Sequence, residues 1–271
     1  MRPAVPLGLF YAAFLAAPIL VLFVLSLAAN ETFDRFDLGR YAGFFGERIN
    51  WIVLVDTLRL GVISTIVCLC LGFPLALVHA RLSPRGKAVL IFLVVLPQLT
   101  SSVVRTFAWV VILGRQGIVD GTLVALGLPP AGLLYTMPGV VLALAQIDLP
   151  LMVLPLIGAL GRQDPHLKEA STVLGAGPWR TFFKVTLPLG LPAVYAGSLL
   201  VFTSSISAFV TQSIIGGGRL TFMPKYIYDL SSSTHTWPFA AAAVIVLLST
   251  VLLAVTAFGL LGQASLRRAG A

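Results

Sequence analysis

The sequence predicts an all-α polytopic membrane protein, because its composition is apolar and its apolar runs are long. Of the 271 residues, 58% are hydrophobic and only 10% are charged, whereas soluble domains carry roughly 25% charged residues. The mean hydropathy is +0.99. Apolar runs close to the roughly 20 residues that cross a bilayer as a helix recur from one end of the chain to the other. We therefore expect a multi-pass helical bundle.

Six transmembrane helices are predicted, each a run of apolar residues bounded by polar or charged ones. Their expected limits are Leu9–Ala29, Thr57–Ala80, Ala88–Val111, Thr136–Leu160, Leu187–Val210 and Pro238–Leu261. The first is interpreted as an uncleaved anchor, because its apolar run exceeds the usual 7–15 residues of a signal-peptide core. Prolines interrupt several later spans and remove backbone donors, so kinks are expected. These prolines are Pro74, Pro97, Pro150, Pro155 and Pro192.

The distribution of charge predicts that both termini lie in the cytoplasm. Lysine and arginine concentrate in the cytoplasmic segments of membrane proteins. With the N-terminus inside, the inner segments contain ten of these residues and the outer segments six. The inner segments are then residues 1–8, 81–87, 161–189 and 262–271. This topology accounts for the formal charge of +8, so the basic excess does not require a nucleic-acid partner.

A single transmembrane domain is expected over residues 1–271. Within it, residues 1–55 supply the first span and an outer loop, and residues 56–262 form a core of five helices that includes the cytoplasmic loop 161–189. Neither a metal site nor a cofactor site is expected. Cys68 and Cys70 point to different sides of one helix, and the three histidines show no ligand spacing.

The loop 161–189 is too regular in pattern to be a simple connector. Asp164 followed by Pro165 predicts a helix start, because the Asp side chain caps free amides and proline already has a helical φ. Apolar residues then recur at helical spacing. The expected apolar face comprises Leu167, Ala170, Val173 and Leu174, and the polar face comprises Lys168, Glu169, Ser171 and Thr172. Gly175 is expected to end this helix in the left-handed conformation.

A second short helix is expected to begin at Pro178. Its apolar face would carry Trp179, Phe182, Phe183 and Leu187. On periodicity alone, an amphipathic connector lying in the membrane interface and anchored by Trp179 explains the pattern equally well.

The order of residues in this loop favours a more specific interpretation. The chain reads Glu169-Ala170-Ser171, three residues, Gly175, nine residues, then Val185-Thr186-Leu187-Pro188. This resembles the EAA motif of permeases in binding-protein-dependent ABC importers, which reads Glu-Ala-Ala, three residues, Gly, nine residues, an aliphatic residue, one further residue and Leu-Pro. Ser171 is the one departure, a small residue for a small one. Val104–Gly117 and Leu149–Pro155 look like the corresponding segments of the polyamine-type branch.

The resemblance implies a type I (MetI-like) importer permease fold and an external motor. In that family the loop helix docks into a cytoplasmic ATPase. The residues implied here are Asp164, Leu167, Glu169, Ala170, Ser171, Leu174 and Gly175. The sequence has no GxxxxGK[ST] motif for ATP phosphates, so ATP and Mg²⁺ are expected in the partner, and no catalytic residue is expected in this chain. The implied assembly in the bacterial inner membrane adds a second, distinct permease, two ATPases and an extracytoplasmic solute-binding protein.

Asp148 is the one acidic residue deep in a predicted span, where a charge costs roughly 2.5–3.5 kcal/mol on insertion scales. It either attracts a cationic solute on the transport path or pairs with an arginine, such as Arg105 or Arg59, of this or a partner chain. Trp109 is a candidate for cation–π contact with an amine. Hydroxyl groups in the fifth span either allow close helix packing or line the passage. The candidate pathway residues are Arg105, Trp109, Asp148, Ser204 and Ser207.

Alternatives to a polyamine importer remain at this point. The resemblance favours putrescine or spermidine, with ferric iron, thiamine or another small solute as alternatives. A secondary transporter working without ATP would show inverted repeats, and the sequence shows no convincing one. An intramembrane enzyme is disfavoured, because HExxH and GxSxG are absent and Asp148 has no second carboxylate as a catalytic partner.

Overall fold

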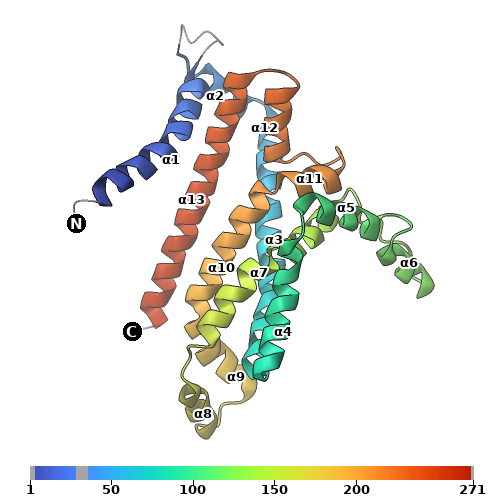
Figure 1. The fold of residues 1–271 in the computed structure, drawn as a ribbon, viewed down its shortest axis with the longest axis vertical. Helices are drawn as coiled ribbons and strands as arrows, with labels where there is room; N and C mark the ends of the chain where they lie inside the picture. Colours follow the sequence, from blue (N-terminus) through green and yellow to red (C-terminus); the bar gives the residue numbers. More distant parts are fainter. Residues whose placement is uncertain (1–3, 29–35, 270–271) are drawn as a thin grey trace. The chain divides into compact units, whose positions relative to one another are not determined.

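The computed structural model describes residues 4–28 and 36–269, and these parts of the chain are built from helices (Figure 1). The one β interaction among them is an isolated antiparallel bridge between Ala28 and Phe36. In chain order the helices are α1 (Ala4–Leu27), α2 (Gly39–Gly46), α3 (Arg48–Arg81), α4 (Pro84–Val95), η1 (Leu96–Leu99), α5 (Ser102–Leu113), α6 (Ile118–Ala125), α7 (Met137–Leu160), α8 (Pro165–Val173), α9 (Pro178–Thr181), η2 (Phe182–Thr186), α10 (Leu187–Ser207), α11 (Phe209–Gly216), α12 (Met223–Ser232) and α13 (Trp237–Ala269). The all-α prediction is confirmed.

The chain divides into two compact units. The first comprises Met1–Asp56 and Phe222–Leu253, and the second comprises Thr57–Thr221 and Ala254–Ala271. The second unit contains α4 to α11 and the loop 161–189, so it carries every residue of the predicted site.

Buried polar contacts organise the first unit. The Asn50 side chain is fully buried. Its Oδ1 accepts a hydrogen bond of 2.6 Å from the Tyr226 hydroxyl, and its Nδ2 donates one of 2.9 Å to the Phe44 carbonyl oxygen. Phe44, also fully buried, packs against the ring of Phe239 at 6.3 Å between centroids. One asparagine therefore ties α12 to the start of α3 and the end of α2.

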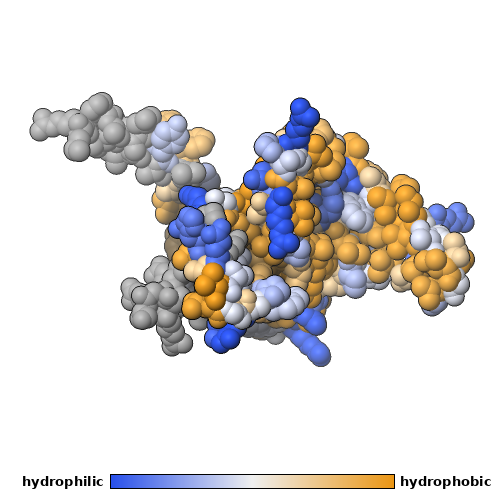
Figure 2. All heavy atoms as spheres, turned by 90° about the horizontal axis from the view of Figure 1, so that it is seen from below, coloured by the Kyte–Doolittle hydropathy of each residue, from blue (hydrophilic) through white to orange (hydrophobic). Residues whose placement is uncertain are grey.

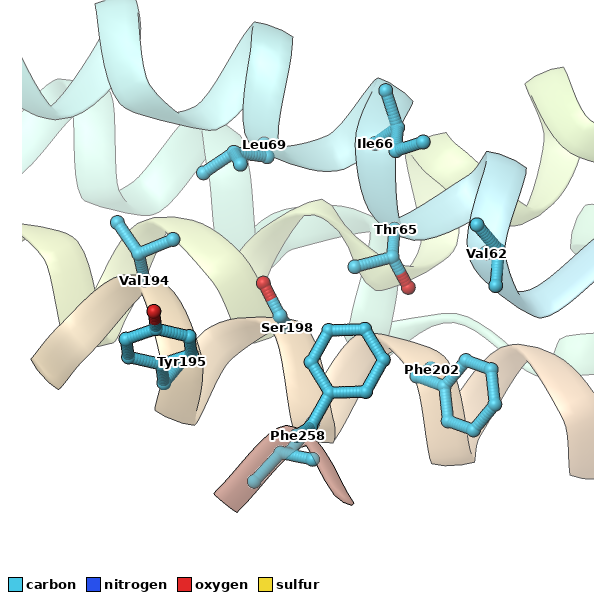
Figure 3. A pocket seen from close by; sticks show the side chains of 10 residues that line it. Val62, Thr65, Ile66, Leu69, Val194, Tyr195, Ser198, Phe202 and Phe258 are labelled. Carbon is cyan, nitrogen blue, oxygen red and sulfur yellow. The ribbon is translucent and has the colours of Figure 1, made fainter. Parts of the chain in front are cut away.

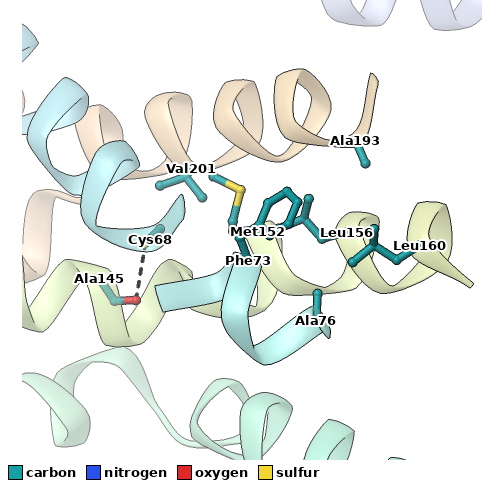
Figure 4. Packing of buried hydrophobic residues seen from close by; sticks show 9 residues of the cluster. All are labelled: Cys68, Phe73, Ala76, Ala145, Met152, Leu156, Leu160, Ala193 and Val201. Atoms are coloured by element: carbon teal, nitrogen blue, oxygen red, sulfur yellow. Dashed lines mark hydrogen bonds between the residues drawn. The ribbon is translucent and has the colours of Figure 1, made fainter. Parts of the chain in front are cut away.

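The core of the second unit is built around Met152 of α7. A Cβ atom added at Gly72 of α3 would lie 2.9 Å from Met152 Cγ, and one added at Gly197 of α10 would lie 2.8 Å from its Sδ. Both glycines thus let their helices approach Met152 closely, as small residues do in membrane bundles. Figure 4 shows Met152 packed among Phe73, Leu156 and Val201.

Five helical stretches in the described residues are long and apolar enough to cross a membrane, so the protein is multi-pass. They are Arg48–Arg81, Ser102–Ala125, Met137–Leu160, Pro178–Ser207 and Trp237–Leu260. Two of them join shorter elements, α5 with α6 and α9 with η2 and α10. In the view of Figure 2, apolar side chains cover much of the surface, as expected of helices that face lipid. The first helix contributes a shorter apolar stretch, Ala16–Leu27, and the predicted end at Ala29 lies outside the described residues. A sixth span and the orientation stay predictions.

The third predicted span, Ala88–Val111, is wrong as a single helix. Helix α4 ends at Val95, a 3₁₀ turn follows over Leu96–Leu99, and α5 begins at Ser102. Pro97 explains the break, because proline lacks the N–H of a helical bond and its ring clashes with the carbonyl four residues earlier. The Thr100 amide instead donates to the Pro97 carbonyl oxygen at 3.4 Å.

The fifth predicted span, Leu187–Val210, is three residues too long. Helix α10 ends at Ser207, and Ala208 leaves the helical region with φ −74° and ψ 62°. Gln212 of α11 stabilises this break, because its buried Nε2 donates to the carbonyl oxygens of Ser205 at 2.7 Å and Ile206 at 3.1 Å. The prediction failed here because the hydrogen bonds that end the helix come from a glutamine that follows the apolar run.

Candidate functional site

The predicted helix start at Asp164 is confirmed. Helix α8 begins at Pro165, and Asp164 Oδ1 accepts a hydrogen bond of 3.0 Å from the His166 amide. Gly175 then has φ +76°, the left-handed conformation that glycine adopts with least strain. Its amide donates to the Thr172 carbonyl oxygen at 2.9 Å. Both ends of α8 are therefore fixed by local sequence.

Helix α8 exposes apolar side chains that this chain leaves uncovered. Val173 and Leu174 are 87% and 85% exposed, and Leu167 is 46% exposed. A groove of about 380 Å³ runs along the helix, with Leu167, Ala170 and Leu174 on one wall and Arg180 and Lys184 of the following segment on the other. An apolar wall beside two cations suits an amphipathic partner surface.

The prediction that placed Ser171 on the polar face of α8 is wrong. Its hydroxyl oxygen lies 2.8 Å from the Thr181 hydroxyl oxygen, and it lines the same groove as Leu167 and Leu174. The helical spacing explains this, because residues three and four apart share a face. Ser171 therefore joins α8 to α9.

Glu169 lies on the other side of α8. Its Oε2 is 3.1 Å from His166 Nδ1, and both side chains are exposed. Glu169 also lines a cavity of about 580 Å³, together with His79, Lys87 and Gln163. The carboxylate is thus exposed, and its one hydrogen-bond partner among the described side chains, His166, is exposed as well.

The chain after Gly175 forms a second short helical segment, as expected. We call this segment, α9 and η2 (Pro178–Thr186), the elbow. Helix α9 begins at Pro178 and passes into the π-helical turn η2, where the Leu187 amide donates back to the Phe182 carbonyl oxygen. Trp179 stacks on Phe183 at 6.2 Å between ring centroids, and Phe182 meets Phe73 of α3 edge-on at 5.3 Å. The elbow is therefore packed onto α3 and runs without interruption into α10.

The polar centre of the second unit is the Asp148 carboxylate of α7. Asp148 is 1% exposed. Its Oδ1 accepts from the Ser204 hydroxyl at 2.7 Å and its Oδ2 from the Ser205 hydroxyl at 2.6 Å. Within the described residues, neither Arg105 nor Arg59 forms a salt bridge with it. Among the described residues, the Asp148 side chain is therefore bonded by two serine hydroxyls and by neither arginine.

The other predicted pathway residues lie on two different helices around this centre. Trp109 Nε1 of α5 donates to Gln146 Oε1 of α7 at 3.2 Å. Arg105 Nη2 donates to the Thr100 carbonyl oxygen at 3.4 Å, and its Nε and Nη1 are buried without a partner among the described residues. Ser207 donates only to carbonyl oxygens of its own helix, so it is not part of the Asp148 cluster.

Sequence reasoning missed two members of this cluster. Ser205 and Gln146 were not selected as site residues, although each bonds a residue that was. The signal for Ser205 was present, because it directly follows Ser204 in a hydroxyl-rich stretch. The signal for Gln146 was weaker, because it is a polar residue in an apolar run, two residues before Asp148, with no motif around it.

The second unit thus combines helices of membrane-spanning length with a short, capped loop helix that exposes apolar side chains. The family model of the binding-protein-dependent transport system inner membrane component matches residues 69–263. The chain belongs to this family, and the resemblance seen in the sequence is confirmed. It is a transport subunit of an ABC system that works with a binding protein, and it is not an enzyme.

Individual relatives agree with this assignment. The spermidine/putrescine transport system permease protein PotB of Haemophilus influenzae is 36% identical over 208 residues, which cover 76% of this chain and 72% of that protein. The inner membrane ABC transporter permease protein YdcU of Escherichia coli is 33% identical over 211 residues, covering 73% and 67%.

A solved structure supports the fold. A chain of a bacterial ABC transporter that imports the acidic polysaccharide alginate superposes with a TM-score of 0.78 at 20% identity, covering 96% of this chain and 93% of the other. At this identity the likeness concerns the fold alone.

Proposed function

We propose that this chain forms, with a second and distinct permease chain, the membrane pathway for a polyamine such as putrescine or spermidine, delivered by an extracytoplasmic binding protein. The relatedness to a spermidine/putrescine permease over most of both chains supports this substrate class. Two cytoplasmic ATPases that use ATP and Mg²⁺ would supply the energy. The chain would cross the bacterial inner membrane six times with both termini in the cytoplasm.

The observation that carries the proposal is the uncovered apolar face of α8. Leu174 of this short, capped helix is 85% exposed. Apolar surface in contact with water is unfavourable, so burial against a partner would stabilise the helix. We assign this partner as the ATPase, with Leu167, Ala170 and Leu174 against its groove and Glu169 bonding a cationic or amide group. Asp164, Ser171 and Gly175 fix the helix that makes the contact.

Movement of the ATPase would reach the pathway through continuous structure. Helix α8 is bonded to α9 through Ser171 and Thr181, and η2 leads directly into α10. Ser204 of α10 in turn bonds Asp148 of α7. A rigid-body displacement of α8 would therefore shift the helices that carry the polar cluster, and ATP binding would open the pathway outward.

We assign the solute path to the polar cluster of the second unit together with Ser207 of α10, which lies outside that cluster. Trp109 offers an aromatic face to an amine, and Ser204 and Ser207 offer hydroxyl oxygens. Asp148 contributes negative charge while its two oxygens hold serines in place. Arg105 has buried N–H groups with no acceptor among the described residues. The second permease would provide these acceptors, because a protonated amine is itself only a donor.

The docking assignment is tested by Leu174→Asp. A carboxylate in an apolar contact should weaken ATPase binding by at least about tenfold, equivalent to about 1.4 kcal/mol, and reduce ATP-driven uptake in proteoliposomes. Thermal stability should not change, because the side chain is exposed. Leu174→Met is the matched control and should retain both activities. Normal ATPase binding by Leu174→Asp would contradict the assignment.

The substrate class is tested by uptake. Proteoliposomes that contain the full assembly and its binding protein should accumulate radiolabelled putrescine or spermidine only with ATP inside. Excess unlabelled polyamine should abolish the signal, whereas ferric iron or thiamine should not. Uptake of iron or thiamine with no polyamine uptake would overturn the substrate while leaving the permease assignment intact.

A further inference from the structure

A cavity of about 260 Å³ lies within the second unit, and none of the described residues of the polar cluster or of α8 lines it. Figure 3 shows that its walls come from α3, α10 and α13. The lining includes Val62, Thr65 and Leu69 of α3, Ser198 and Phe202 of α10, and Phe258 of α13. None of the described residues that line it is charged. All three helices are long and apolar enough to cross the membrane.

Ser198 is the informative residue of this cavity. It is 7% exposed, and its hydroxyl has no hydrogen-bond partner among the described residues. In Figure 3 the hydroxyl points between the helices into the cavity. Some hydroxyls of the same helices bond the backbone one turn earlier, as Thr65 does to Gly61 at 2.7 Å and Thr203 to Leu199 at 2.8 Å. The buried Ser64 Oγ of α3, which does not line the cavity, also has no partner among the described residues. Buried polar groups are normally paired, and the Ser198 hydroxyl is available to a molecule that enters the cavity.

The lining defines the chemistry of that ligand. An ordered water needs two to four polar partners, and this cavity is lined almost entirely by carbon. Apolar cavities of about 150 Å³ already hold benzene, so the present one accommodates a somewhat larger body. A charged molecule would find no counter-ion there. The ligand is therefore an uncharged molecule that partitions into the bilayer.

We propose that this cavity binds a small, neutral, largely apolar molecule with one oxygen that pairs with the Ser198 hydroxyl, such as a phenol or a short alcohol. Bound there, the molecule would contact α3, α10 and α13 at once and hold them at one separation. Because α10 continues from the elbow that follows α8, occupancy should slow transport. That consequence rests on the proposed function, whereas the binding itself does not.

The experiment uses 4-fluorophenol and the full chain in lipid nanodiscs, followed by ¹⁹F saturation-transfer NMR. Ser198→Ala removes the hydroxyl and should weaken binding about two- to tenfold, the range expected for one hydrogen bond. Ser198→Leu should also fill the cavity and abolish saturable binding. Thr203→Val, one and a half turns away and outside the cavity, should bind as the wild type does. Thermal unfolding of each variant verifies that it is folded.

A second measurement needs no variant. 4-Fluorotoluene has the same shape without the hydroxyl and should bind the wild-type chain more weakly, and unlabelled phenol should compete with 4-fluorophenol. Equal, non-saturable signals from wild-type and protein-free nanodiscs would overturn the proposal. So would native mass spectrometry that finds a phospholipid retained by the wild type and lost from Ser198→Leu, because the cavity would then belong to a lipid chain. Failure of polyamine uptake would leave both results unaffected.

Discussion

At the scale of single residues, Asp148 acts first as an acceptor that joins two helices. Its two carboxylate oxygens bond Ser204 and Ser205 across the contact between α7 and α10. In the low dielectric of a buried site such charge-assisted bonds are strong, and an unpaired carboxylate would be costly. The two serine hydroxyls therefore offset part of the cost of burying this acid between the helices.

We predict that Asp148→Asn lowers thermal stability, because a carbamoyl group carries no charge and presents only one acceptor oxygen to the two hydroxyl donors. A double-mutant cycle with Ser205→Ala should give a coupling free energy of at least about 0.6 kcal/mol, the mean for side-chain hydrogen bonds in membranes. Additive effects would contradict the coupling. The Ser207 hydroxyl donates to a carbonyl oxygen of its own helix. Ser207→Ala should therefore leave thermal stability nearly unchanged.

The same cycle bears on transport. If Asp148 attracts the solute in addition, Asp148→Asn should raise the KM for polyamine in proteoliposomes after correction for the amount of folded protein. An unchanged KM with lower expression would remove Asp148 from the solute path and leave it as a structural acceptor.

At the scale of elements, Gly175 determines how α8 meets the elbow. A Cβ atom placed there would meet nothing within 4 Å, so the only obstacle to substitution is the positive φ. We predict that Gly175→Ala costs roughly 1–2 kcal/mol of backbone strain and reduces uptake per ATP hydrolysed. Gly175→Asn should cost less, because asparagine tolerates the left-handed region. Equal effects of the two substitutions would contradict this origin.

The packing of α3, α7 and α10 gives a second element-scale prediction. Gly72→Ala would place its Cβ against the Met152 side chain, whereas Gly197→Ala would also place one 3.2 Å from the Met152 Cα. Each should destabilise by about 1–3 kcal/mol, as overpacking does. Met152→Ala should relieve Gly72→Ala and leave much of the Gly197→Ala defect, measured by thermal unfolding in detergent. Equal relief would refute this model of the contact.

At the scale of the whole molecule, topology is directly measurable. In a chain lacking Cys68 and Cys70, a single cysteine introduced at His166 should react with an impermeant maleimide only from the cytoplasmic side. One introduced at Thr234 should react only from outside. Both side chains are exposed in the structure, so unequal reactivity reports sidedness. Labelling of both from the same side would exclude the predicted orientation.

The sequence predicted helices better than it predicted their contacts. The cap at Asp164 and the stop at Gly175 were predictable, because each depends on the chemistry of adjacent residues. The break at Leu96–Leu99 was predicted only as a kink, since Pro97 shows where a helix is weakened and the surrounding packing determines how far it opens. The pairing of Asp148 with Ser205 joins residues 57 positions apart, and no local pattern specifies it.

The π-helical turn at Phe182–Thr186 has a further consequence. Such a turn contains one residue more than the α-helical spacing requires, and each residue of an α-helix corresponds to about 100° of rotation. If the extra residue left the turn and the turn became α-helical, the segment before Phe182 would rotate by about this angle. Helix α10, after the turn, would keep its hydrogen bonds. A one-residue change of register at Phe182–Thr186 would therefore redirect the loop without breaking the hydrogen bonds of α10.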